Sequence, residues 1–262
     1  RTIKMGGSIE NSLQGNLPGL VVIMQNATPG EEARSITMQI RGGASMGNNT
    51  PLILVDGVER SFSNIDPNEI AAISILKDAS ATAVYGVKGA NGVIIVTTKR
   101  GTHGSLQLDF SAETSMKTAT RLPEYMNSYQ TIMLRNEAYR NDGKWSSIIP
   151  DATIEHYRLK DSPYLYPDFD WMNFYFKPAI DQNYNLNARG GNDFVQYFVS
   201  LGFLSEGDIF NVGDLFPSKY DKKNAHYWSK RYNFRNNLDI NLTKTTNIQV
   251  TLAGNPKISN KP

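Results

Sequence analysis

Side chains that could support catalysis are few in this 262-residue sequence. The three histidines, His103, His156 and His226, have no second ligand residue at metal-like spacing, so we interpret them as loop residues. Asp168 and Asp170 stand beside Pro167, and both a cation site and a solvated loop turn fit this pattern. The sequence has no cysteine, no nucleophile-elbow serine and no phosphate-binding glycine loop. We therefore expect no enzyme, no resident metal and no cofactor.

Aromatic residues gather in the stretch 157–176, which could recognise a ligand or a protein. The candidate contact residues are Tyr164, Tyr166 and Trp171. Aromatic rings stack on sugars and also bury well at protein contacts. We expect this loop to pack against itself or against a partner subunit in preference to direct contact with substrate.

Charge and hydropathy narrow the class of protein. The 27 basic and 25 acidic residues give a net charge of +2, which provides no footprint for binding nucleic acid. Mean hydropathy is −0.41, and no apolar run approaches the roughly twenty residues that a membrane helix requires. Barrel strands carry their membrane signal in alternation instead, so the low hydropathy does not argue against a membrane protein. The absence of cysteine is compatible with an oxidising envelope compartment.

The stretch 51–101 is rich in strand and capping signals. A short apolar strand at 52–55 ends at Asp56-Gly57, which suits a tight turn. Asp66 is placed as a helix N-cap with Pro67 at the first position, and Glu69 at the third position is expected to close a capping box. Further expected elements are a strand at 73–76, a helix at 80–85 and a strand at 92–96. This order predicts a small mixed sheet with two small helices.

Several short motifs in the first hundred residues resemble the plug domain of TonB-dependent outer-membrane transporters of the SusC/RagA-like branch. In chain order they are LQG (13–15), PGL (18–20), IRG (40–42), LVDG (54–57), LKDAS (76–80), AVYG (83–86) and KGANGVI (88–94). A single motif of this kind would be weak, but their order and spacing follow the family. The segments DW (170–171), QNYNL (182–186) and GG (190–191) also resemble the opening barrel strands of that family. The resemblance implies an α+β plug domain at 1–101.

Two candidate sites lie in the plug, the first of them placed by this resemblance. The loop 42–50, GGASMGNNT, would face the substrate chamber, although a flexible connector has the same composition. Its candidate contact residues are Ser45, Met46, Asn48 and Asn49. Arg41 ends an alternating strand and should point toward the barrel wall, where we expect it to pair with a carboxylate. The candidate partners are Asp109, Glu113, Asp239 and residues beyond this sequence; a solvated strand-end arginine is the alternative.

Beyond residue 101, apolar and polar residues alternate as they do in transmembrane barrel strands. The alternating segments are 106–113, 183–189, 195–203, 231–242 and a strand that starts at 248. Phe198 interrupts the polar row of the third segment. A soluble β-sandwich also alternates, but here long connections alternate with the short turns 190–193 and 243–246, as in an outer-membrane barrel. We therefore predict that residues 102–262 are antiparallel strands and extracellular loops of a transmembrane β-barrel, which the family builds with 22 strands.

The resemblance implies import of oligosaccharides or peptides across the outer membrane of a Gram-negative, Bacteroidota-type bacterium. The implied partners are a SusD-like surface lipoprotein, the TonB complex energised by ExbB and ExbD, and the lipid bilayer. A siderophore or cobalamin receptor without a lid lipoprotein and a soluble β-rich binding or adhesion module are the alternatives. Because five strands cannot close a barrel, we expect the remaining strands to lie outside this sequence. The opening residues contain no charged-then-apolar signal, so we expect the signal peptide outside the sequence too, and the resemblance implies a TonB box upstream.

Overall fold

The computed structural model describes residues 20–24, 36–40, 50–61, 65–77, 84–211 and 227–260. Two short strands, β1 (Leu20–Met24) and β2 (Ile36–Ile40), pair antiparallel near the N-terminus. The elements that follow are β3 (Leu52–Val55), β4 (Val58–Glu59), the 3-10 helix η1 (Pro67–Glu69), β5 (Ile70–Leu76), the 3-10 helix η2 (Gly86–Gly89) and β6 (Val93–Thr98). The four strands β3 to β6 form a mixed sheet in the order β4-β3-β6-β5. The predicted strands 52–55, 73–76 and 92–96 lie at β3, β5 and β6, whereas most of the predicted helix 80–85 lies outside the described residues.

The core of this N-terminal region lies around β3 and β6, which run parallel to each other. Val55, Ile94 and Val96 are fully buried there, and Leu20 and Ile40 from the β1–β2 pair join the same apolar cluster. The dipeptide Asp56-Gly57 turns the chain after β3 with φ angles of 50° and 84°, a left-handed conformation that Asp tolerates and Gly accepts freely. The N-terminal region therefore has its own apolar core.

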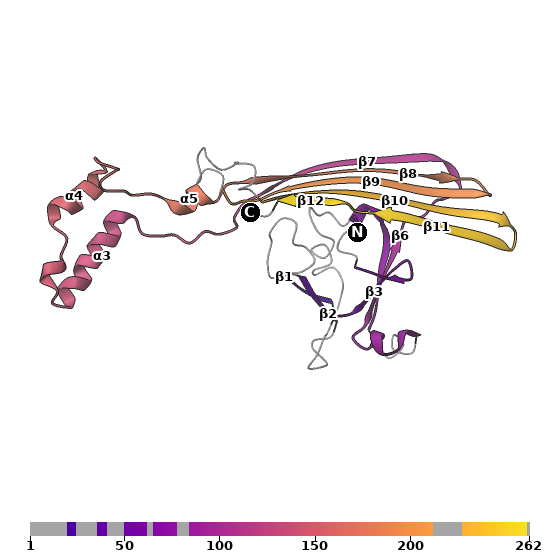
Figure 1. The fold of residues 1–262 in the computed structure, drawn as a ribbon, viewed down its shortest axis with the longest axis horizontal. Helices are drawn as coiled ribbons and strands as arrows, with labels where there is room; N and C mark the ends of the chain where they lie inside the picture. Colours follow the sequence, from indigo (N-terminus) through magenta and orange to yellow (C-terminus); the bar gives the residue numbers. More distant parts are fainter. Residues whose placement is uncertain are drawn as a thin grey trace.

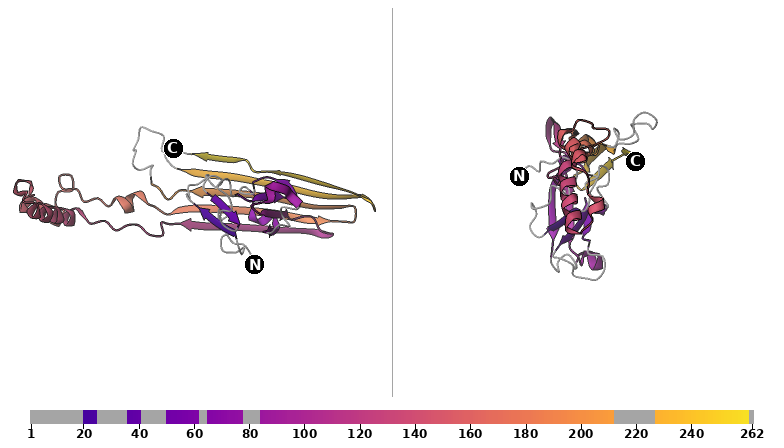
Figure 2. Two further views of the ribbon diagram at one scale, coloured as in Figure 1. Left: turned by 90° about the horizontal axis from the view of Figure 1, so that it is seen from below. Right: turned by 90° about the vertical axis from the view of Figure 1, so that its left-hand side faces the viewer.

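A second sheet contains the strands β7 (Gly104–Lys117), β8 (Ala179–Gly191), β9 (Val195–Gly207), β10 (Trp228–Thr243), β11 (Thr246–Gly254) and β12 (Lys257–Asn260). Neighbouring strands are antiparallel, in the order β7-β8-β9-β10-β11, and β12 pairs with β10 beyond the end of β11. We call this sheet the wall. It is long and gently curved, and the N-terminal elements lie against one of its faces (Figures 1 and 2). The five alternating segments predicted from the sequence all lie in wall strands, which extend several residues further at most ends.

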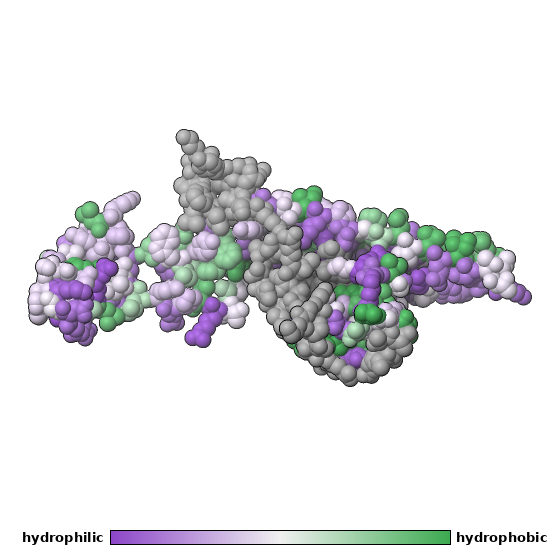
Figure 3. Space-filling view, turned by 60° about the horizontal axis from the view of Figure 1, so that its bottom comes forward, coloured by the Kyte–Doolittle hydropathy of each residue, from purple (hydrophilic) through white to green (hydrophobic). Residues whose placement is uncertain are grey.

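The two faces of the wall differ in polarity, as the alternation predicts. On β10, the side chains turned toward the N-terminal region are polar and buried, whereas Tyr232 and Phe234 on the opposite face are 44% and 39% exposed. The buried polar set on this strand is Ser229, Arg231, Asn233, Arg235 and Asn237. At the end of the wall in Figure 3, hydrophobic residues lie along one side and hydrophilic residues along the other. Phe198, the predicted exception, lies on the polar face and is buried.

The connection between β7 and β8, residues 118–178, projects far beyond the ends of the strands (Figure 1). We call it the arm. Its helices are α3 (Ser128–Asn141), the 3-10 helix η3 (Trp145–Ser147), α4 (Asp151–Leu159) and α5 (Trp171–Tyr175). None of the helices within the described residues is long and apolar enough to cross a membrane.

Candidate functional site

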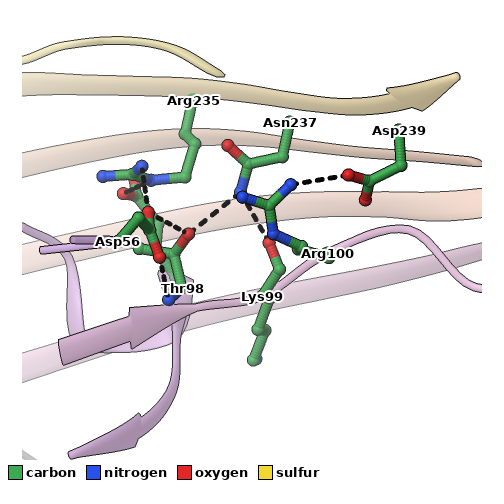
Figure 4. A network of polar contacts seen from close by, with 8 residues as sticks. Asp56, Thr98, Lys99, Arg100, Arg235, Asn237 and Asp239 are labelled. Atoms are coloured by element: carbon green, nitrogen blue, oxygen red, sulfur yellow. Dashed lines mark hydrogen bonds and ion pairs between the residues drawn. The ribbon is translucent and has the colours of Figure 1, made fainter. Parts of the chain in front are cut away.

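A buried ion pair lies where the N-terminal region meets the wall. Arg235 of β10 is 3% exposed at its side chain, and its Nε donates a hydrogen bond to Glu69 Oε2 at 2.7 Å. Its Nη1 lies 3.7 Å from Asp56 Oδ2. The Glu69 side chain is equally buried. We call Arg235, Glu69 and Asp56 the latch; Figure 4 labels Arg235 and Asp56.

The turn chemistry of the N-terminal region positions both latch carboxylates. Asp66 caps η1 by accepting a hydrogen bond from the Asn68 backbone at 2.8 Å, with Pro67 at the first position, as predicted. The predicted capping box is wrong, because Glu69 turns to Arg235 on the wall. Asp56 accepts from the backbone nitrogen and the hydroxyl of Thr98 at 2.9 and 2.7 Å, which ties the turn after β3 to β6.

Burial sets the electrostatics of the latch. Loss of hydration raises the pKa of the Glu69 carboxyl, while the hydrogen bond and the charge of Arg235 act to lower it. Burial is the larger effect, so the pKa of Glu69 lies above its usual value although Arg235 opposes the shift. Without this guanidinium, Glu69 would have to take up a proton or remain as a stranded charge.

A second set of contacts fixes the chain where it leaves β6 and enters the wall. The Asn237 side-chain nitrogen donates to Thr98 Oγ1 at 3.0 Å and to the Lys99 carbonyl at 2.6 Å. Arg100 Nη1 lies 2.7 Å from Asp239 Oδ1. We call this set the clamp; Figure 4 shows its residues beside the latch.

Gly101 completes the clamp by close backbone approach. A Cβ atom at this position would lie 2.2 Å from the Tyr197 nitrogen and 2.5 Å from the Gln196 carbonyl carbon, so only glycine fits against β9 here. The segment that joins the N-terminal region to the wall is therefore held by both β9 and β10.

Comparisons with known proteins identify both regions of the chain. Residues 4–93 match the family model described as TonB-dependent Receptor Plug Domain. The TonB-dependent receptor P26 of Formosa agariphila is 33% identical over 243 residues, which are 90% of this chain and 22% of that receptor. The TonB-dependent receptor SusC of Bacteroides thetaiotaomicron is 29% identical over 78% of this chain and 20% of its own length. The chain belongs to the SusC-like TonB-dependent receptors.

Solved structures agree on the fold of this SusC-like chain. The RagAB peptide transporter superposes with a TM-score of 0.76 at 22% identity, over 98% of this chain and 30% of that chain. The ferric enterobactin receptor PfeA gives a TM-score of 0.55 at 13% identity, over 97% of this chain and 31% of its own. The predicted fold class, a plug followed by antiparallel barrel strands, is confirmed. The chain spans about a fifth of the length of the curated relatives named above.

The site residues predicted in the plug lie outside the described residues. They are Arg41, Ser45, Met46, Asn48 and Asn49. Of the proposed partners of Arg41, Asp239 pairs with Arg100 of the clamp, whereas Asp109 and Glu113 lie exposed on β7.

The sequence analysis did not predict the contact of Arg235 with Glu69 and Asp56. Here the arginine comes from the barrel wall and the carboxylates come from the plug, whereas sequence reasoning sought the reverse arrangement. The available signal was the presence of Arg231 and Arg235 on the lumen-facing side of one alternating strand, where a buried guanidinium requires a carboxylate partner.

The candidate aromatics of the arm have different surroundings. Tyr164 is fully exposed. Tyr166 stacks on His156 with ring centroids 4.6 Å apart, and Trp171 meets Phe169 edge to face at 4.8 Å. The arm therefore packs partly against itself, as expected, and leaves Tyr164 and much of Trp171 uncovered. A groove of about 1150 Å³ lies between the two extended stretches of the arm and includes Trp171 in its lining.

The aspartates near Pro167 have structural roles in the described arm. Asp170 caps α5 by accepting from the Asn173 backbone at 3.0 Å. Asp168 accepts from the Ser128 backbone at 2.9 Å and lies 2.8 Å from Lys160 Nζ, so it joins the two ends of the helical tip. Among the described residues, no group of three or more metal-ligating side chains could hold an ion. These contacts favour the loop-turn interpretation over the cation site.

We expect the helical tip of the arm to loosen in acid where its two ends meet. The hydrogen bond from Lys160 and that from the Ser128 backbone lower the pKa of Asp168 below its usual value of 3.8. The carboxylate therefore contributes stability above about pH 4, and that stability is lost as the pH falls through the lower folded pKa. Hydrogen exchange at Ser128, corrected for the intrinsic rate, should accelerate over this range.

Asp168→Asn should show the same fast exchange at neutral pH. Asp142→Asn is the control, since Asp142 pairs only with the exposed Lys144 among its described ion pairs and should leave Ser128 protected. Protection at Ser128 that is unchanged in Asp168→Asn would rule out this role for Asp168.

Proposed function

We propose that this chain forms the plug and the first barrel strands of a TonB-dependent importer in the outer membrane of a Gram-negative bacterium. Its substrates are oligosaccharides or peptides, a SusD-like surface lipoprotein covers the barrel, and the TonB complex supplies the energy from the periplasm. The relatives that carry this proposal are SusC and the RagAB peptide transporter.

The polar character of the plug–wall contact is the observation that supports import best. The plug keeps its apolar core around β3 and β6, and it meets the wall through the ion pairs and hydrogen bonds of the latch and the clamp. Such contacts can be exchanged for water when the plug moves, at a small net cost when all partners are hydrated. An apolar contact would lose its burial on the same movement. A polar contact between plug and wall therefore suits a plug that must close the barrel and also move to let substrate through.

Uptake in living cells tests the proposal. The gene is deleted in the bacterium that encodes the protein and restored on a plasmid, and uptake of labelled oligosaccharide pools and peptide pools is measured with and without a protonophore. We expect the deletion to abolish uptake of one pool, and the plasmid to restore it only in energised cells. If neither pool is affected, the proposal is wrong.

The siderophore alternative has one observation in its favour. The Rhizobactin receptor of Rhizobium meliloti is 39% identical over 67 residues, but these are only 22% of this chain. Ferric siderophores and cobalamin therefore belong in the same assay. Loss of their uptake, with oligosaccharide and peptide uptake unchanged, would favour an importer of that class.

Labelling of intact cells should place the arm outside the cell. Tyr164 is fully exposed in the arm, and we expect Tyr164→Cys in the full-length chain to react with an impermeant maleimide on intact cells. Thr245→Cys in the β10–β11 turn, at the opposite end of the wall, should react only after the outer membrane is permeabilised. The reverse result would show that the topology is inverted.

A further inference from the structure

The outward-facing side chains of the wall line up in rows across β7 to β10 because the strand registers are continuous. One row consists of Ala112, Tyr184, Phe203 and Tyr232. Its rings lie beside one another, with centroids 6.3 Å apart between Tyr184 and Phe203 and 5.0 Å apart between Phe203 and Tyr232. A continuous aromatic band therefore crosses three neighbouring strands.

The rows on either side of this band differ in polarity. The row toward the periplasmic turns is apolar: Phe110, Leu186, Leu201 and Phe234. On these four strands the row toward the arm is polar, with Thr114, Gln182, Ser205 and Lys230, whereas β12 adds the apolar Ile258. The polarity therefore changes within one step of the strand pleat on these four strands, and the exposed Met116 and Ile180 lie one row further toward the arm.

We infer that the outer boundary of the membrane's hydrocarbon layer crosses the wall between the aromatic row and the polar row. The aromatic row then lies at the interface, where amphipathic rings are favoured, and the polar row lies among the lipid headgroups. This inference rests on the proposed function, since it takes the outward face of the wall to be a lipid-facing barrel surface. To the proposed function the inference adds the depth in the membrane at which each row of side chains lies.

The length of the apolar stretch agrees with this position. On β9, Val195 begins the outward apolar series after the periplasmic turn and Ser205 is its first polar member. At about 3.3 Å per residue the two are about 33 Å apart along the strand. A strand tilted by about 40° reduces this to about 25 Å along the membrane normal, which is the height of the apolar band in outer-membrane barrels.

A further detail near the boundary also fits. Lys230 Nζ lies 5.6 Å from the ring centroid of Trp228, so a cation and an amphipathic ring stand together at the level of the headgroups, which carry anionic phosphates.

Depth-dependent quenching tests the boundary. Single cysteines at Leu201, Phe203 and Ser205 in an otherwise cysteine-free full-length chain are labelled with a nitrobenzoxadiazole dye. The protein is reconstituted in phosphatidylcholine vesicles that carry a nitroxide spin label on the upper segment of the acyl chains. We expect strong quenching at Leu201, intermediate quenching at Phe203 and several-fold weaker quenching at Ser205. Ser111→Cys on the lumen face is the control and should be quenched least.

The outcomes separate the boundary from the proposed function. Equal quenching at Leu201 and Ser205 would overturn the boundary while leaving the barrel inserted. Quenching at Leu201 no stronger than at Ser111 would show that the wall does not face lipid, and this would overturn the proposed function as well. A difference of several-fold between Leu201 and Ser205 supports the inference.

Discussion

Cells that carry Arg235→Ala in the full-length transporter are expected to become sensitive to antibiotics too large for ordinary porins. The change removes the guanidinium 2.7 Å from Glu69 and leaves that carboxylate buried in the seam between plug and wall. Breaking one partner of a buried pair costs about 3–5 kcal/mol. A loss of this size would raise the population of the loosened plug by about a hundredfold or more. The measurement is the minimum inhibitory concentration of vancomycin.

Two further variants isolate the latch. Arg189→Ala is the matched control, because Arg189 also faces the lumen from the wall but donates to the neighbouring Gln107 at an exposed position. Cells with Arg189→Ala should be as sensitive to vancomycin as cells with the unchanged transporter. Combining Arg235→Met with Glu69→Leu removes both charges, so much of the resistance to vancomycin should return. If Arg235→Ala leaves sensitivity and uptake unchanged, Arg235 does not hold the plug.

Replacement of Gly101 by valine should nearly abolish the folded transporter in the outer membrane. Even its Cβ would lie 2.2 Å from the Tyr197 nitrogen, and the atoms it meets include backbone atoms of β9, which cannot rotate away. The connecting segment would have to leave β9, and the Arg100–Asp239 and Asn237–Lys99 contacts would be displaced with it. The amount of heat-modifiable barrel in outer-membrane fractions is the measurement.

A second glycine of the wall provides the control for this prediction. At Gly207 an added Cβ would meet its nearest atoms at 3.4 Å or more, which is ordinary contact, so Gly207→Ala should assemble normally. Normal amounts of folded Gly101→Val, together with normal uptake, would show that β9 can yield at this point and that the clamp does not control assembly.

The sequence predicted those elements of the fold that depend on local pattern. Alternation of side chains along segments such as 195–203 defined the wall strands, because a barrel strand must separate its two faces residue by residue. Asp66 and Pro67 predicted the start of η1 for a similarly local reason, since capping involves only neighbouring backbone groups.

The latch could not be predicted in this way because it joins residues that are far apart in the chain. Glu69 stands at the spacing of a capping box, and only the position of β10 shows that Arg235 is the stronger partner. Likewise, the requirement for glycine at position 101 depends on the path of β9 across the seam. The inferred membrane boundary could not be predicted from the sequence either, because it depends on the registers between strands. No single strand shows that its polar residue is aligned with those of its neighbours.

The parallel pairing of β3 and β6 has a mechanical consequence. β6 continues directly into the clamp, so its C-terminal end is anchored on the barrel. A pull on the chain upstream of β3 would therefore act on opposite ends of two parallel, hydrogen-bonded strands. In this shear geometry the four residue pairs from Leu52–Val93 to Val55–Val96 share the load and must yield together, whereas strands pulled from the same end separate pair by pair. The parallel pair at the centre of the plug would thus resist such a pull in shear.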